Sequence, residues 1–401
     1  MSKKVAALPS WFWPEEVPRT VGVPPFFLEE ALVEKWAEEQ PEAPAIVTGE
    51  KTLTYAALGE QVSRSAAFIA ERAEGQAKRV LVSVSSPTKA LLLILAALKA
   101  RSLVHVTLFL EGEALARFAP DIVVAQGRCD PNVASVVLSD EQVLNAPPSH
   151  AVEHAGEPRA PALAFSTDRD LLALHSHYGL LAGAIAFAAF MEMPHGMRFL
   201  LNQHPSRWYG FYSAMIALYL GGSVVACDTE QVGATVEMLQ KWRPDAAFFT
   251  PEQAGLLTQG MTRAARKALW RSCEWTFMPV SGPFSGRQRK ALSNLFGRPI
   301  LTVYGLPESG PVAASHPSWH LEESVGIPLT NAELRPVDPA SREAIEVPWE
   351  LLEFAGIEVK ASHMMLGYDD AKETAERLRR RWFFTGRLAA MDANGLYYLL
   401  P

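Results

Sequence analysis

Short β-branched segments alternate with longer apolar segments along this chain, and this alternation restricts the fold more than any other feature. Strands are predicted at residues 79–84, 103–107 and 122–125, with a helix at 89–99 between the first two. Because strand, helix and strand at this spacing form βαβ units, the strands are expected to lie parallel in a sheet covered on both faces. The sequence therefore predicts an α/β fold with mostly parallel sheets.

The second half of the chain repeats the alternation. Its predicted elements are a helix from residue 178, strands at 198–201, 223–226 and 246–249, and helices at 209–220 and 232–242. The most apolar segment, 178–190, is too short to cross a bilayer and is predicted to be a buried helix. After Gly305 the sequence becomes rich in strands and turns, as at 352–360, which predicts a smaller antiparallel module.

Four parts are predicted along the chain. They are an N-terminal arm rich in proline and tryptophan at 1–25, a first αβ subdomain at 26–159, a second αβ subdomain at 160–310 and a β-rich module at 311–401. Proline at this density prevents regular structure in the arm, while the clustered aromatic residues Trp11, Phe12 and Trp13 are costly to leave in water. The arm is therefore expected to pack on its own domain or to contact another protein.

Composition excludes several classes of function. A net charge of −7 gives no electrostatic basis for binding nucleic acid or an anionic membrane, so neither is expected as a partner. The three cysteines, Cys129, Cys227 and Cys273, lie far apart without metal-binding spacing, which argues against a zinc site or a disulfide framework. Because the N-terminus also lacks an apolar signal segment, a cytoplasmic location is predicted.

One segment has the composition of a ligand site at the end of a strand. Residues 301–310 read Leu-Thr-Val-Tyr-Gly-Leu-Pro-Glu-Ser-Gly. Gly305 would let the backbone approach a ligand, and the carboxylate of Glu308 could hold a cation or a polar group. An ordinary strand followed by a turn would give the same pattern.

Five segments in their order resemble the adenylate-forming superfamily, which comprises acyl-CoA synthetases, aryl-acid ligases and the adenylation domains of peptide synthetases. They are Leu-Thr-Tyr-Ala-Ala-Leu at 53–58, Val-Ser-Gly-Pro at 280–283, Tyr-Gly-Leu-Pro-Glu at 304–308, Met-Leu-Gly-Tyr at 365–368 with Thr374, and Trp-Phe-Phe-Thr-Gly-Arg-Leu at 382–388. The resemblance extends from about residue 26 to residue 401. It implies two αβ subdomains and a small β-rich module, with the active cleft between them and ATP and magnesium bound there.

The resemblance places a phosphate-binding loop near Ser166 and Thr167, but this loop departs from the family's pattern. The family's loop is rich in glycine and ends in Pro-Lys-Gly, so that backbone N–H groups and a lysine surround the phosphates. Here the glycines and the lysine are missing, and Asp168 and Asp170 stand where phosphates would lie. Two carboxylates there would repel a triphosphate, with Arg169 as the compensating cation.

Further positions that the resemblance assigns to the nucleotide are Ser281, Gly282, Pro283, Tyr304, Gly305, Glu308 and Arg387. Arg387 replaces the family's ribose-binding aspartate, and a guanidinium is a donor that cannot accept from ribose hydroxyls. Glu308 matches the family's metal-holding glutamate and would bind a metal only if magnesium is present. Otherwise it is expected to accept a hydrogen bond. Its neighbour Pro307 replaces a threonine.

Members of the superfamily continue into a mobile C-terminal domain that supplies a catalytic lysine. Because the sequence ends at Leu399-Leu400-Pro401, this domain is expected to be absent. Together with the changes in the phosphate loop, at the ribose position and at the metal site, this predicts that ATP-dependent adenylation has been lost and that no cofactor is bound.

The acyl site is expected to persist. His204, Trp208, Tyr209 and Phe211 resemble the family segment whose aromatic residues form a wall of the carboxylic-acid site, which suits an aryl or medium acyl group. Trp208 and Phe211 could equally be core residues at helical spacing. His175, His177 and His204 are hypothesised to converge there, where a histidine could act as a general base.

Three functions remain open from the sequence. The first is a superfamily domain without adenylation that binds an acyl or aryl group, an acyl carrier thioester or a partner protein. The second is an AMP-forming acid ligase that uses ATP and magnesium and is completed by a separate C-terminal domain. The third is ATP-independent acyl transfer through His175, His177 or His204. Whether the protein is an enzyme is therefore undecided.

Overall fold

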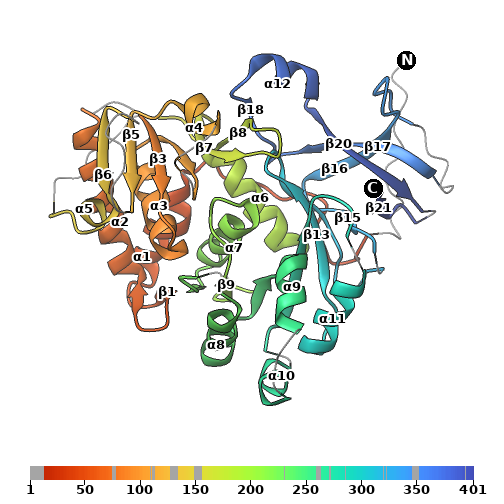
Figure 1. Ribbon diagram of the computed structural model, residues 1–401, viewed down its shortest axis with the longest axis horizontal. Helices are drawn as coiled ribbons and strands as arrows, with labels where there is room; N and C mark the ends of the chain where they lie inside the picture. Colours follow the sequence, from red (N-terminus) through yellow and green to blue (C-terminus); the bar gives the residue numbers. More distant parts are fainter. Residues whose placement is uncertain are drawn as a thin grey trace.

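The computed structural model describes most of the chain. The described residues are 13–74, 78–108, 110, 113–126, 134–148, 156–229, 231–258, 263–270, 272–284, 286–318, 320–321, 323–345, 352–392 and 394–401. Trp11, Phe12 and Cys129, which the sequence analysis singles out, lie outside the described residues. The described strands form three sheets, of which two are large and one is small (Figure 1).

The first sheet has seven strands in the order β18-β8-β7-β4-β3-β5-β6. Their bounds are Gly367–Tyr368, Leu172–Ser176, Pro161–Ser166, Leu103–Val106, Arg79–Ser83, Ile122–Ala125 and Val136–Ser139. The strands from β7 to β6 pair in parallel, whereas β8 pairs antiparallel with both β7 and β18. The parallel strands are mostly buried, as expected for a sheet covered on both faces.

The second sheet has nine strands in the order β15-β14-β13-β12-β11-β9-β10-β1-β2. Their bounds are Ile327–Pro328, Gly310–Ala314, Leu301–Leu306, Trp275–Val280, Ala246–Phe248, Arg198–Leu201, Ser223–Ala226, Pro44–Val47 and Thr52–Thr54. The strands from β13 to β1 pair in parallel, and the remaining strands at the two edges pair antiparallel. The predicted α/β class with mostly parallel sheets is confirmed.

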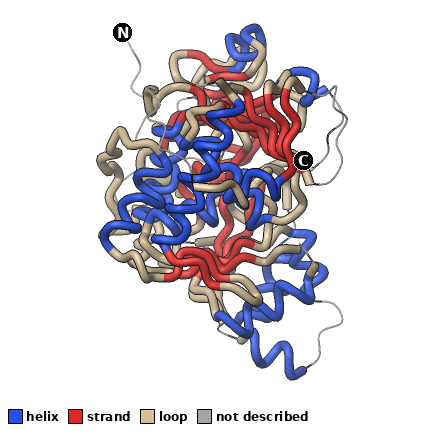
Figure 2. Tube along the Cα trace, turned by 90° about the vertical axis from the view of Figure 1, so that its left-hand side faces the viewer, coloured by secondary structure: helices blue, strands red, loops and turns tan. Residues whose placement is uncertain are grey.

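The third sheet is smaller and antiparallel, as predicted for the C-terminal part. It consists of β16 (Ala332–Val337), β17 (Leu352–Ala361), β20 (Trp382–Met391), β19 (Leu378–Arg379) and β21 (Tyr397–Leu399). Seen from the side, strands gather in separate bands with helices between and around them (Figure 2).

Helices cover the sheets. The longer ones are α2 (Tyr55–Arg72), α3 (Pro87–Lys99), α6 (His177–Phe190), α7 (Trp208–Tyr219), α8 (Val232–Trp242), α9 (Pro251–Thr258) and α11 (Gly286–Phe296). Of these, α3, α6, α7 and α8 lie where the sequence predicts helices. The shorter ones are α1 (Lys35–Glu39), α4 (Glu113–Phe118), α5 (Asp140–Leu144), α10 (Arg263–Leu269) and α12 (Ala371–Arg377), and a π-helical turn at Glu30–Glu34 precedes α1. Helix α2 begins where the Thr54 hydroxyl accepts a hydrogen bond from the Ala57 N–H and so caps the helix.

Helix α6 is the buried helix that its apolar sequence predicts. Nearly all of its side chains are buried, and it contacts β7 and β8 of the first sheet as well as α7 and β14. A helix that is apolar on all sides must be covered on all sides, so α6 holds the two large sheets together. No described helix is both long and apolar enough to span a membrane. The cytoplasmic location stays a prediction.

The sheets exchange strands across the boundary predicted at residue 160. The early strands β1 and β2 belong to the second sheet, whereas β7 and β8, which follow residue 160, belong to the first. The hairpin of β7 and β8 therefore extends from the first sheet towards the second.

The described part of the N-terminal arm packs on its own domain. The Trp13 ring meets the Phe190 ring edge to face with a centroid distance of 5.8 Å, and its indole N–H donates to the Val17 carbonyl. The Thr330 hydroxyl donates to the Pro18 carbonyl over 2.7 Å, and Asn331 exchanges hydrogen bonds with the Val21 backbone. These contacts fasten the arm to the segment between β15 and β16.

Candidate functional site

A cleft with a volume of about 670 Å³ opens at the carboxyl ends of the parallel strands. This edge of an open α/β sheet is where ligands usually bind. The first sheet contributes the ends of β4 and β7, the second sheet contributes the ends of β12 and β13 and the loops after β9 and β11, and β20 contributes one side chain. Its lining residues include Ser166, Thr167, Asp168, Arg207, Trp208, Tyr209, Glu252, Ser281, Gly282, Pro283, Pro307 and Arg387.

The predicted phosphate loop is a tight turn between β7 and β8. Ser166 is opposite Leu172 in the hairpin, and the Thr167 N–H donates to the Leu171 carbonyl over 2.9 Å. The Thr167 hydroxyl accepts hydrogen bonds from the N–H groups of Arg169 and Leu171, each at 3.3 Å. The turn therefore uses these backbone donors internally. Asp170 adopts a left-handed conformation with φ of 57°, which aspartate tolerates better than most residues.

An ion pair joins this turn to the third sheet. The Arg387 Nη2 atom on β20 lies 2.7 Å from the Asp168 Oδ2 atom. The two side chains are 34% and 62% exposed, so the pair is solvated and contributes only modestly to stability. Both residues line the cleft, and their pairing spans it from the first sheet to the third. Asp168 and Arg387, which both differ from the residues expected from the family's pattern, thus contact each other.

Glu308 is buried below the cleft and has a protein donor. Its Oε1 atom accepts a hydrogen bond of 2.8 Å from the Tyr368 hydroxyl, and its backbone carbonyl accepts one from the Met365 N–H. Burial raises the pKa of Glu308 above its ordinary value, although the Tyr368 hydrogen bond opposes this. Among the described residues, no three metal-binding side chains cluster as a metal site would require. Glu308 fastens β18 to the turn between β13 and β14.

Gly305 and Trp208 form a close contact at the bottom of the cleft. A Cβ atom on Gly305 would lie 2.7 Å from the Trp208 indole and 2.6 Å from the Gly310 carbonyl oxygen. Glycine at this position therefore lets the indole lie against β13. Tyr304 is fully buried beneath this floor, whereas Ser281, Gly282 and Pro283 line the cleft from the end of β12.

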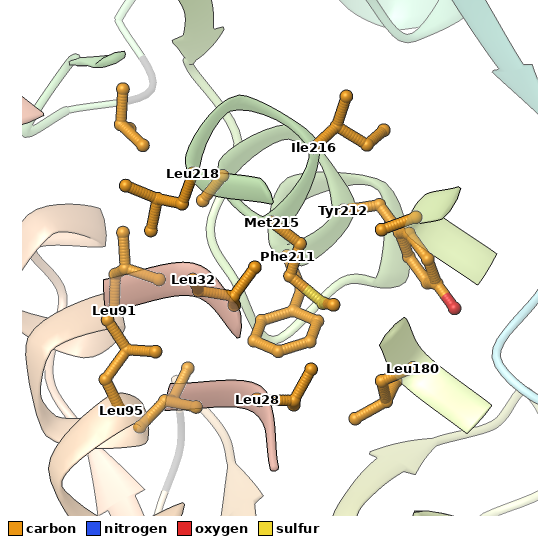
Figure 3. Packing of buried hydrophobic residues seen from close by; sticks show 14 of the residues in the cluster. Leu28, Leu32, Leu91, Leu95, Leu180, Phe211, Tyr212, Met215, Ile216 and Leu218 are labelled. Carbon is orange, nitrogen blue, oxygen red and sulfur yellow. The ribbon is translucent and has the colours of Figure 1, made fainter. Parts of the chain in front are cut away.

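The predicted aromatic wall divides between the cleft and the core. Trp208 and Tyr209, in the first turn of α7, line the cleft. Phe211 is fully buried and points into the hydrophobic core beside Leu28, Met215 and other apolar residues (Figure 3). It contributes to the cleft only indirectly, through an edge-to-face contact with Phe165.

The three histidines form hydrogen bonds with the backbone of three different segments of the chain. His175 lies 2.7 Å from the Pro307 carbonyl through Nε2, and the His177 Nδ1 atom accepts from the Leu28 N–H over 3.3 Å. His204 Nε2 lies 2.9 Å from the Val84 carbonyl. Burial lowers the pKa of His175 to about 4 and that of His177 to about 3. None of the three is among the described residues that line the cleft, and their role as a general base stays a prediction.

Several residues of the cleft were not identified from the sequence. Arg207, the N-cap residue of α7, and Glu252, in the first turn of α9, are exposed and line the cleft. Tyr368, the donor to Glu308, lies in the predicted Gly-Tyr segment but had no assigned role. The N-terminal positions of α7 and α9 after strands could have indicated Arg207 and Glu252, whereas the Tyr368 contact depends on the sheet order.

Comparison with known proteins identifies related sequences. Residues 172–368 match the family model of AMP-binding enzymes. A long-chain-fatty-acid–CoA ligase of Bacillus subtilis (strain 168) is 25% identical over 231 residues, which covers 56% of this chain and 40% of that ligase. A 3-hydroxybenzoate–CoA ligase of Aromatoleum sp. (strain CIB) is 24% identical over 402 residues, covering 88% of this chain and 73% of the relative.

Solved structures share the fold. A long-chain-fatty-acid-CoA ligase of Archaeoglobus fulgidus superposes with a TM-score of 0.84 at 15% identity, covering 97% of this chain and 86% of that one. ATP-bound MatB of Rhodopseudomonas palustris gives a TM-score of 0.79 at 18% identity, with coverage of 94% and 78%. The chain thus matches the model of AMP-binding enzymes over residues 172–368 and shares the fold of the acyl-CoA ligases, in agreement with the resemblance to the adenylate-forming superfamily that its motifs indicate.

Proposed function

We propose that this protein is a superfamily domain that binds an acyl or aryl group, as an acid or as a carrier thioester, without ATP-dependent adenylation. The observation that carries the proposal is the ion pair between Arg387 and Asp168. It joins the position of the phosphate loop to the position of the ribose-binding acid. A nucleotide bound in the superfamily manner would have to break this pair and place its phosphates beside Asp168.

The residues present do not fit ATP and magnesium. A phosphate-binding loop needs outward N–H donors and a cation, but the Thr167 hydroxyl accepts from the N–H groups of Arg169 and Leu171. Arg387 offers donors where ribose hydroxyls need an acceptor. Glu308 is buried and its Oε1 atom already accepts a hydrogen bond from the Tyr368 hydroxyl, so this oxygen has a protein partner in place of a metal ion. The phosphate loop, the ribose position and the metal position thus all disfavour binding of ATP with magnesium.

The remainder of the cleft supports an acyl or aryl ligand. The Trp208 and Tyr209 rings and the proline-rich end of β12 provide an apolar wall, and the exposed Arg207 provides a cation for a carboxylate. The similar proteins are named as ligases of a fatty acid and of 3-hydroxybenzoate, both of which combine a carboxylate with an apolar body. We propose a ligand of the same chemical class for this chain.

Acyl transfer by a histidine base is less well supported. The Nε2 atoms of His175 and His204 are engaged by backbone carbonyls, and His177 accepts from a backbone N–H. A general base must reach the proton that it removes, and none of these rings is among the described residues that line the cleft.

The proposal can be tested by calorimetry and thermal unfolding with separate ligands. The wild-type protein should show no stabilisation by saturating ATP with magnesium, but it should be stabilised by benzoate, octanoate or their N-acetylcysteamine thioesters. A ligand at 100 times its Kd adds about 2.7 kcal/mol, which such measurements detect easily. Trp208→Ala should remove the acyl effect, whereas Lys372→Ala, at an exposed site on α12 outside the cleft, should retain it.

The ligase alternative predicts a different result. Stabilisation of the wild type by ATP with magnesium, or carboxylate-dependent release of pyrophosphate, would refute the proposal in favour of an adenylating enzyme. The Asp168→Gly/Arg387→Asp variant restores the family's residue types at two positions. If only this variant gained ATP binding, the ion pair would be shown to block the nucleotide.

A further inference from the structure

A second groove lies between α10 and α11, and its lining shares no described residue with the cleft. Helix α10 is at the opposite end of the molecule from α12 and β18 (Figure 1). The groove has a volume of about 670 Å³ and is lined by Arg263, Arg266, Lys267, Trp270, Ala291, Asn294 and Leu295. Every charged residue in this described lining is a cation, although the whole chain has a net charge of −7.

The cations and the tryptophan follow helical spacing. Arg263, Arg266, Lys267 and Trp270 are related by steps of three and four residues, which places them on one face of α10 and its continuation. All four are exposed. Among the described residues, no carboxylate pairs with Arg263 or Lys267. On this face, Arg263 and Lys267 therefore present positive charge that no carboxylate of the described part of the chain neutralises.

Trp270 is held as a fixed apolar platform. A Cβ atom on Gly297 would lie 2.5 Å from the indole, so the ring rests directly on the backbone at the end of α11. Gly297 has φ of +66°, a conformation that glycine adopts without strain. Although one side of the ring is covered, the residue remains 54% exposed. An exposed indole fixed beside cations is typical of an interaction site rather than of ordinary surface.

The chemistry of the groove favours an acidic polypeptide over other anions. A groove between two helices accepts a helix whose carboxylates, at four-residue spacing, meet Arg263 and Lys267 while an apolar side chain covers Trp270. A bilayer surface is too flat to enter a groove. Nucleic acid would require a longer basic stripe, and the chain's net negative charge would oppose its approach.

We propose that the groove between α10 and α11 docks an acidic, amphipathic helical segment of a partner protein, with carboxylates on Arg263 and Lys267 and an apolar side chain on Trp270. The site is separate from the cleft and does not depend on what the cleft binds. Docking there leaves the carboxyl edge of the sheets accessible.

The proposal is tested by fluorescence anisotropy with the full chain and a labelled helical peptide. The peptide carries glutamates at four-residue spacing on one face and leucines beside them, and a second peptide carries glutamines in place of the glutamates. The acidic peptide should bind, and the Arg263→Glu/Lys267→Glu variant should bind it roughly tenfold or more weakly, because attraction becomes repulsion. Trp270→Ala should also weaken binding, and added salt should weaken the wild-type interaction.

A matched variant separates the groove from overall charge. Lys372→Glu/Arg379→Glu changes the net charge equally at exposed positions on and just after α12. It should bind the acidic peptide like the wild type, while both double variants keep the wild-type melting temperature. Equal binding of the glutamine peptide, equal loss in the Lys372→Glu/Arg379→Glu variant, or binding only to phosphatidylserine vesicles or duplex DNA would overturn the proposal.

Discussion

Replacing Gly305 by alanine tests the close contact that forms the bottom of the cleft. The added Cβ atom would lie 2.6 Å from the Gly310 carbonyl oxygen and 2.7 Å from the Trp208 indole. The first neighbour is backbone in the adjacent strand β14 and cannot rotate away. The second is a buried ring on α7, which can move only towards the cleft.

The cost follows from these contacts. Overpacking a well-packed site by one methyl group typically costs about 1–3 kcal/mol, and a backbone neighbour favours the upper part of that range. Alanine also restricts the unfolded chain, which returns about 0.4–1 kcal/mol. We therefore expect Gly305→Ala to lower the free energy of unfolding by about 2 kcal/mol.

Gly282 provides the matched control. It also lines the cleft, but a Cβ atom there would meet nothing within 4 Å. Gly282→Ala should therefore leave stability unchanged or raise it by up to about 1 kcal/mol. Urea denaturation of both variants, followed by circular dichroism, measures the difference, provided that the slope of free energy against urea stays the same. Equal stabilities, or a larger loss at Gly282, would refute the argument.

Four further predictions concern buried polar groups and an ion pair in or near the cleft. Tyr368→Phe should lower the free energy of unfolding by about 1–3 kcal/mol, because buried Glu308 loses its donor. Burial raises the folded-state pKa of Glu308 above 4.5, so the contribution of this carboxyl to stability is greatest at low pH and falls as pH rises through the folded pKa. The Glu308→Gln variant should not show this fall when the free energy of unfolding is measured by urea titration at several pH values. Burial lowers the folded pKa of His175 from 6.5 to about 4, so stability should fall as pH decreases through this interval, and His175→Gln should fall less steeply. A double-mutant cycle of Asp168→Ala and Arg387→Ala should give a coupling of about 0.2–1 kcal/mol that salt weakens, and a coupling of zero would mean that the pair does not form in solution.

The sequence alone determined the fold class and the positions of the central strands and helices of the two large sheets. Strands such as β5 (Ile122–Ala125) and β9 (Arg198–Leu201) begin and end where the pattern predicts, because β-branched runs and helical periodicity are local properties. Two residues that the motifs singled out, Ser281 just after β12 and Arg387 on β20, line the cleft. The residue types also indicated how the site differs chemically from the family's pattern, for example that Arg387 is a hydrogen-bond donor where the family has an acceptor.

Only the tertiary structure decided which of these residues meet. Asp168 and Arg387 are 219 positions apart, and their contact depends on how the hairpin of β7 and β8 faces the third sheet. Within helix α7, Trp208 lines the cleft whereas Phe211 packs in the core, because three residues turn a helix by less than a full rotation. Which side of α7 faces the core is set by the elements that pack around the helix. Side-chain partners depend on sheet order and helix orientation, which local sequence patterns do not encode.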